Sequence, residues 1–231
     1  MGRVPWLPGS SRSFTLVELL VVIAIIGLLA GLSVPAISRA TAKAESTGCV
    51  NNLRQIGTAM NLFAAENNGY LPYATGPSAA GSGNSYGFNN WQAPLAVIMG
   101  VGIGSASFPT QDSFQNAKAK HPFNCPACKT GFRTYTANMR AMGFLPGVSA
   151  YPQRKITSLV KSSQLILVAD DTFGDPAPAN SGTDYFDEAS YSYTNRIGIR
   201  HGGRANALFG DFHVESITAS NLIASNNINP F

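Results

Sequence analysis

Three cysteines are the first side chains in this sequence whose type and spacing suggest chemistry. Cys125 and Cys128 lie in the segment NCPACK, and Cys49 lies far upstream. A single C-x-x-C pair is ambiguous, because zinc needs two further ligands and a thioredoxin-like redox pair needs a βαβ context. His121 and Cys49 could complete a mixed metal site. In an oxidising compartment the plainest expectation is a structural disulfide between Cys125 and Cys128, with no metal bound; free thiols or thiols linked to Cys49 are the other alternative.

A second group of reactive side chains lies near the C-terminus, in RHGGRANALFGDFHVESI. The pattern predicts two strands joined by a tight turn at Gly210 and Asp211. His201, Asp211 and His213 are metal-ligand types and could converge at one end of this hairpin. Because the sequence fixes no second carboxylate nearby, we expect a turn residue and two solvated histidines instead.

Acidic residues cluster in ADDTFGDPAPANSGTDYFDEAS, where oxygen ligands on a loop would suit calcium. The cluster comprises Asp170, Asp171, Asp175, Asp184, Asp187 and Glu188. Their spacing does not match an EF-hand loop, so we expect a solvated loop and no cofactor, with calcium as the alternative. Neither an H-E-x-x-H motif, nor a P-loop, nor a dinucleotide fingerprint occurs, so we expect no enzymatic activity.

Glu18 is the only charged residue in the apolar segment from Phe14 to Val34. As an α-helix this segment would be about 31 Å long, close to the thickness of a bilayer's hydrocarbon core. An ionisable group in lipid is costly and should either find a partner or reach the headgroups. A cleavage before Phe14 would create an α-amino group, and Glu18 could pair with that group on another copy of the chain.

The length of the apolar segment favours a retained membrane helix over a removed signal peptide. A secretory signal has an apolar region of about 7–15 residues, and here a helical pattern continues past the segment. Basic residues flank both of its ends, so charge alone does not set its orientation in the membrane.

The elements that must position these residues follow from spacing. Leu53, Ile56, Met60 and Phe63 are three or four residues apart, which predicts one buried stripe of a helix. We therefore expect a membrane helix over residues 14–34 and an amphipathic stalk helix over residues 35–66. Pro35 should bend this helix near the membrane exit, and Asn67, Asn68 and Gly69 should end it.

The remaining residues, 67–231, are expected to form one exported domain. A stretch rich in Gly, Ser and Pro comes first, WQAPLAVIMG reads as a short buried helix, and short β-like runs begin near residue 132. This order predicts an α+β fold in which the long helix lies across an antiparallel sheet.

The segment SFTLVELLVVIAIIGLLAGLSVPAI resembles the N-terminus of type IV pilins and type II secretion pseudopilins. The resemblance implies that residues 1–13 are a leader and that prepilin peptidase cuts between Ser13 and Phe14. It also implies methylation of the Phe14 amine, with Glu18 as the fifth residue of the mature chain and Pro35 as a helix-bending proline. Ser13 departs from the family, which carries Gly before the cut.

The resemblance further implies a location and a topology. The protein would sit in the bacterial inner membrane with a single span, its N-terminus in the cytoplasm and its C-terminal domain in the periplasm or outside. Its expected partners are prepilin peptidase, the inner membrane, and other copies or related pseudopilins. The net charge of +4 is small and no basic run occurs, so no nucleic-acid partner is expected.

The C-terminal stretch is similar to the H-x(9)-D-G motif of a large group of prepilin-like proteins. His201 and Asp211 have the required spacing, but Phe212 replaces the Gly. Since Phe avoids positive φ, a left-handed turn at residue 212 is not expected.

Two functions remain open. The first is a non-enzymatic subunit that assembles into a type IV pilus or a type II secretion pseudopilus. The alternative is a membrane-anchored module that never polymerises and captures polysaccharide or peptide. Its aromatic candidates are Tyr70, Tyr73, Tyr86, Phe88 and Trp91.

Overall fold

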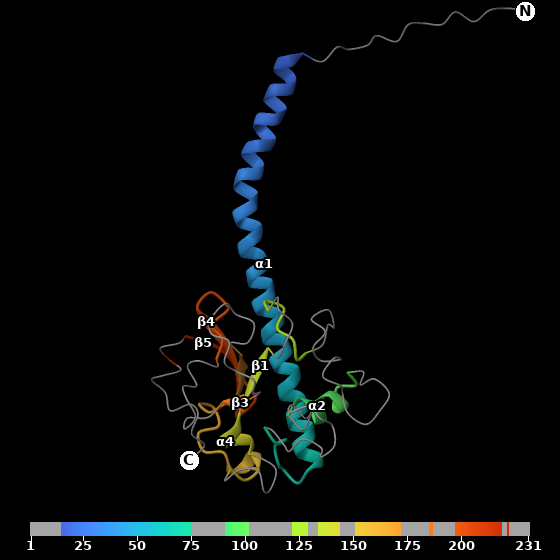
Figure 1. The fold of residues 1–231 in the computed structure, drawn as a ribbon, viewed down its shortest axis with the longest axis vertical. Helices are drawn as coiled ribbons and strands as arrows, with labels where there is room; N and C mark the ends of the chain where they lie inside the picture. Colours follow the sequence, from blue (N-terminus) through green and yellow to red (C-terminus); the bar gives the residue numbers. More distant parts are fainter. Residues whose placement is uncertain are drawn as a thin grey trace, which may run out of the picture. The chain divides into compact units, whose positions relative to one another are not determined.

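The computed structural model describes residues 15–74, 91–101, 122–128, 134–143, 151–171, 185–186, 197–218 and 221. The chain divides into two compact units, Met1–Thr41 and Ala42–Phe231. The helix α1, Leu16–Glu66, contributes its first half to one unit and its second half to the other. All other described elements belong to the second unit (Figure 1).

In the first unit, the residues of α1 are exposed throughout. This part of the helix is long and apolar enough to cross a membrane, and none of its most apolar window is buried inside the protein. A core helix of a globular protein would bury such a window, so this reading is excluded for α1. Pro35 lies within the helix and does not end it; the bend expected there remains a prediction.

The C-terminus of α1 confirms the expected stop. The helix ends at Glu66, and the amide of Gly69 donates to the carbonyl of Ala64 at 2.8 Å. Asn68 and Gly69 both have positive φ, 54° and 84°, as is common where a chain leaves a helix. The local signal Asn-Asn-Gly was therefore sufficient to place this boundary.

The second unit contains a five-stranded sheet in the order β3-β1-β2-β4-β5. Its strands are β1 (Tyr135–Asn138), β2 (Ile166–Asp170), β3 (Tyr185–Phe186), β4 (Arg204–Phe209) and β5 (Val214–Thr218). The four strands β1, β2, β4 and β5 pair antiparallel, as expected, whereas the short strand β3 pairs parallel to β1. One of the β-like runs expected after residue 132, YSYTN at residues 191–195, lies outside the described residues.

Among the described residues, three short helices accompany the sheet. They are α2 (Gln92–Ile98), which confirms the predicted short helix, α4 (Met139–Met142), and the 3-10 turn η1 (Ile156–Ser158). Asn138 caps α4, because its side-chain oxygen accepts from the backbone amides of Arg140 and Ala141.

The second half of α1 packs on one face of this sheet and forms the α+β fold that the sequence predicts. Leu53, Ile56 and Met60 are fully buried, and Phe63 packs against the same cluster. Facing them are apolar residues from three strands and a short helix. These include Tyr135, Ala137, Val168, Leu208, Trp91 and Leu95. Side chains alternate between the two faces of a strand, so Ala205, Ala207 and Phe209 of β4 lie on the face opposite to Leu208. They belong to a separate apolar cluster.

Just after the C-terminal end of β2, two distant parts of the chain pair with each other. Asp171 forms an isolated antiparallel bridge with Ile197, and the amide of Gly198 donates to the carbonyl of Asp170 at 2.8 Å. The two ends of the stretch 172–196 are therefore held side by side.

Candidate functional site

The first candidate site is the N-terminus of α1, where Thr15 and Glu18 form a reciprocal pair. The Oε2 atom of Glu18 accepts from the backbone N–H and from the hydroxyl of Thr15, both at 2.9 Å. The backbone N–H of Glu18 donates to the Thr15 hydroxyl oxygen at 3.3 Å. This capping box satisfies amides that the first turn of a helix leaves open. The other carboxylate oxygen, Oε1, has no hydrogen bond to a described residue.

The surface around Glu18 is apolar and unpartnered within the described chain. Leu16 and Leu32 are 79% and 67% exposed. A Cβ atom added at Gly27 or Gly31 would meet nothing within 4 Å. Gly inside a helix costs about 1 kcal/mol relative to Ala, and packing among the described residues does not explain these two glycines. Ser13 and Phe14, the predicted processing residues, lie outside the described residues.

The second candidate site lies in the second unit, where four segments bring Cys49, Cys125, Asp170 and His201 together. We call these residues the Cys–Asp–His cluster. Their ligand-type atoms all lie within 4.8 Å of one another. The Cys49 thiol donates to Oδ1 of Asp170 at 2.9 Å. The Nε2 atom of His201 lies 3.4 Å from Sγ of Cys125 and 3.4 Å from Oδ2 of Asp170.

Each cluster residue is placed by its own element. Cys49 extends the buried stripe of α1, four residues before Leu53. Asp170 ends β2 and is the register partner of Tyr135 on β1. His201 precedes β4, with its amide bonded to the carbonyl of Arg204, and Cys125 comes from the segment 122–128.

Neighbouring groups hold the cluster in position. The Tyr135 hydroxyl donates to Sγ of Cys49 at 3.2 Å, and the amide of Asn206 donates to Oδ2 of Asp170 at 2.7 Å. The backbone amide of Cys125 donates to the Thr134 hydroxyl oxygen at 2.6 Å. The cluster is therefore a preorganised polar site inside an apolar core.

The cluster is buried, which strongly affects its ionisation. The side chains of His201 and Asp170 are 2% and 0% exposed, and Cys49 and Cys125 are buried. Burial raises the pKa of the Cys49 thiol, and contacts with Cys125 and Asp170 raise it further. Contact with the Cys49 thiol lowers the pKa of Cys125 against the effect of burial, to about 6. Burial lowers the pKa of His201, but its contacts with Asp170 and Cys125 outweigh burial and raise it to about 9.

The structure has all three cysteines as thiols, and the expected disulfide between Cys125 and Cys128 stays a prediction. The buried Cys125 side chain turns toward His201 and Cys49, and the backbone amide of Cys128 bonds to the Cys125 carbonyl at 3.0 Å. The sequence offered Cys49 and His121 as companions of the C-x-x-C pair in a mixed metal site. His121 lies outside the described residues, whereas the structure brings Cys49, Asp170 and His201 to Cys125.

The histidines of the C-terminal hairpin do not converge. Asp211 and His213 lie together in the β4–β5 turn, with Nδ1 of His213 2.5 Å from Oδ1 of Asp211. His201 lies at the opposite end of β4, a strand of six residues that spans about 20 Å. Asp211 is exposed and His213 stacks on Phe209, with ring centroids 4.4 Å apart. The solvated histidine expected at position 201 is thus buried instead.

The turn at Phe212 also differs from expectation. Its φ is 68°, so this residue adopts the left-handed conformation for which Gly is better suited. Phe212 packs against the core, which favours its retention despite the backbone cost.

The remaining predicted site residues fall into two groups. Asp170 and Asp171 are buried rather than on a solvated loop, while the other acidic candidates for calcium lie outside the described residues.

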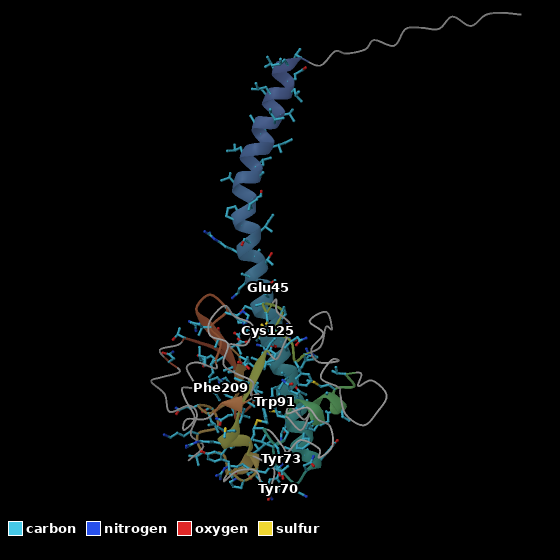
Figure 2. The ribbon with its side chains drawn as sticks, in the orientation of Figure 1. Glu45, Tyr70, Tyr73, Trp91, Cys125 and Phe209 are labelled. Atoms are coloured by element: carbon cyan, nitrogen blue, oxygen red, sulfur yellow. The ribbon has the colours of Figure 1, made fainter. Side chains whose placement is uncertain are left out.

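Trp91 is fully buried in the core, which removes it from the proposed sugar-binding set. Figure 2 shows Tyr70 and Tyr73 at one end of the domain and Cys125 near Glu45 at the other. Tyr86 and Phe88 lie outside the described residues. The expectation that no catalytic motif occurs needs one correction, because residues 83–87 (GNSYG) match G-x-S-x-G, the pattern around the serine nucleophile of many hydrolases; they too lie outside the described residues.

Comparison with known proteins agrees with the N-terminal site. Residues 9–34 match the family model described as the prokaryotic N-terminal methylation motif. The chain is also 35% identical over 79 residues to the type IV major pilin protein PilA of Myxococcus xanthus (strain DK1622). This similarity covers 34% of the chain and 36% of PilA, so the chain matches about a third of that relative's length. No solved structure matches the chain. In its methylation motif, in the 79 residues it shares with a major pilin, and in its long apolar helix packed on an antiparallel sheet, the chain is similar to type IV pilins.

Proposed function

We propose that this protein is a structural subunit that enters a type IV pilus or a type II secretion pseudopilus through its N-terminal helix. Prepilin peptidase removes residues 1–13 and methylates the amine of Phe14. Residues 14–34 then hold the subunit in the inner membrane, with residues 67–231 exported. The match to the methylation motif supports the processing step, and no catalytic role is assigned to any residue.

One observation carries the assembly step, namely a carboxylate in an exposed apolar surface. The Oε2 atom of Glu18 is used by Thr15 of its own helix, but Oε1 has no hydrogen bond to a described residue. In lipid, such an oxygen is stabilised by a cation. The α-amine of Phe14 on a neighbouring subunit is the cation that processing would supply. The small residues Gly27 and Gly31 favour the close helix contacts that such an assembly needs.

Mass spectrometry of the protein purified from its native membrane tests the processing step. We expect a mature chain that begins with N-methylated Phe14. As a matched variant, Ser13→Gly restores the family's residue and should leave less uncleaved precursor than the parent. A chain that retains Met1, or one that begins inside the apolar segment, would contradict the proposal.

The non-polymerising alternative uses the same processing and differs only in assembly. Electron microscopy of material sheared from the cell surface separates the two. Filaments that react with an antibody against residues 67–231 support the assembly function, and membrane-bound protein without filaments supports a surface binding module.

A further inference from the structure

We propose that the Cys–Asp–His cluster is a structural zinc site with Cys49, Cys125, Asp170 and His201 as its four ligands. The proposal goes beyond the assembly function, since no step of processing or polymerisation depends on it. It rests on donor type, donor geometry and burial, each of which points to the same kind of ion.

The donor set matches zinc. Two thiolate sulfurs, one imidazole nitrogen and one carboxylate oxygen are all ligands that Zn²⁺ takes in proteins, and thiolates disfavour magnesium and calcium. Four protein ligands leave no open position for substrate, which is the pattern of structural rather than catalytic zinc.

The donor geometry also fits. Ligands around a tetrahedral zinc ion at about 2.0–2.3 Å lie about 3.3–3.8 Å from one another. In the cluster, Nε2 of His201 is 3.4 Å from both Cys125 Sγ and Asp170 Oδ2. The sulfur of Cys49 is 2.9 Å from Oδ1 of Asp170, and no pair of ligand atoms exceeds 4.8 Å. The side chains can therefore coordinate one ion with only small shifts.

A metal-free network explains this arrangement less well. A single Nε2–H group on His201 cannot point well at both Cys125 and Asp170, although both acceptors are equally close. A Cys49–Cys125 disulfide would turn two donors into an apolar bridge and leave the fully buried Asp170 facing it, which is costly. One divalent cation at the centre satisfies all four groups together.

Groups around the cluster resemble the outer shell of a metal site. Tyr135 donates to Sγ of Cys49, and the amide of Asn206 donates to Oδ2 of Asp170. Such hydrogen bonds orient ligands and tune their basicity. The ion would tie α1, the segment 122–128, the end of β2 and the start of β4 to one point. It also gives His201, the histidine of the H-x(9)-D pattern, a role that Asp211 does not share.

Metal analysis of the full chain, purified in detergent without chelator, tests the proposal. We expect one zinc ion per chain in the parent protein. Loss of zinc is expected in variants that each remove one ligand: Cys49→Ser, Cys125→Ser, Asp170→Asn and His201→Gln. Matched controls that change the same residue types outside the cluster should keep it: Cys128→Ser, Asp211→Asn and His213→Gln.

Two further measurements separate ligand loss from misfolding. His201→Cys replaces one zinc ligand by another and should retain the ion, whereas His201→Gln should not. Cobalt substituted into the parent protein should show the thiolate charge-transfer and ligand-field bands of a tetrahedral site. A chelator should lower the Tm of the exported domain by about 8–16 °C if zinc is present at a thousand times its Kd.

Three results would overturn the proposal. The first is a parent chain that takes up no zinc even after dialysis against it under reducing conditions. The second is a native protein whose mass is lower by two hydrogens, with a peptide linking Cys49 to Cys125. The third is equal loss of zinc in the Cys125 and Cys128 variants. None of these results affects the assembly proposal, which would fail separately through the N-terminal experiments.

Discussion

Replacing Glu18 by Gln separates two roles that this side chain combines. In the structure its Oε2 atom accepts two hydrogen bonds from Thr15 and so caps α1. A glutamine carbonyl oxygen can accept the same two bonds, because Gln also serves in capping boxes. Glu18→Gln therefore keeps the cap and removes the charge, whereas Glu18→Ala removes both. Thr15→Val, in turn, removes the hydroxyl and keeps the charge.

The expected magnitudes differ enough to be measured. Losing one partner of a desolvated ion pair should reduce subunit association by about 10²–10⁴-fold, because the neighbour's amine is left unpaired in lipid. Losing the cap alone should reduce it by about 2–30-fold. Glu18→Gln and Glu18→Ala should thus both abolish visible filaments, while Thr15→Val should only reduce their number.

The assay compares membrane insertion with assembly in the native host. Carbonate-resistant protein in the membrane fraction reports insertion, which should be equal in all three variants and the parent. Sheared surface material, examined by immunoblot and electron microscopy, reports filaments. Normal filament yield from Glu18→Gln would refute the charge-pair reasoning and would leave Glu18 with its capping role alone.

Further predictions concern the stability of the second unit, measured by urea unfolding in detergent. Gly143→Ala should lower the free energy of unfolding by about 3 kcal/mol, because φ is 79° and the new Cβ would lie 2.3 Å from a carbonyl oxygen. Gly100→Ala, at φ 61° with nothing within 4 Å, should cost only about 1 kcal/mol. Leu53→Ala should cost about 2–5 kcal/mol, since Leu53 is fully buried, whereas the half-exposed Leu62 should change stability by less than about 0.5 kcal/mol on the same substitution. Phe212→Gly should be more stable than Phe212→Ala by about 1 kcal/mol, because only Gly relieves the positive φ; the reverse order would contradict that argument.

Local signals in the sequence were enough to predict most of the fold. The three- and four-residue spacing of Leu53, Ile56 and Met60 predicted the buried stripe of α1, and Asn68 and Gly69 predicted its end. Apolar runs predicted β1, β2, β4 and β5, because each run has the length and bounds of a strand. The strand β3 has only two residues and pairs parallel to β1, so it leaves no periodic signal.

The Cys–Asp–His cluster could not be predicted in the same way. Its members come from α1, the segment 122–128, the end of β2 and the residues before β4, and they meet only once the helix has packed on the sheet. The short C-x-x-C spacing predicted a pairing of Cys125 with Cys128, whereas the buried Cys125 side chain lies beside Cys49 of α1. One signal was available: Asp170 ends an otherwise apolar run, ILVAD, and a carboxylate on a buried strand requires partners.

The bridge between Asp171 and Ile197 has a consequence for how such proteins can diversify. This bridge holds the two ends of the stretch 172–196 next to each other. The described residues of that stretch, Tyr185 and Phe186, pair with β1. Doubling the length of a chain segment whose ends are already clamped adds only about 0.6 kcal/mol of closure cost. Descendants of this sequence can therefore lengthen that stretch at little cost while α1, the strands β1, β2, β4 and β5 and the Cys–Asp–His cluster keep their places.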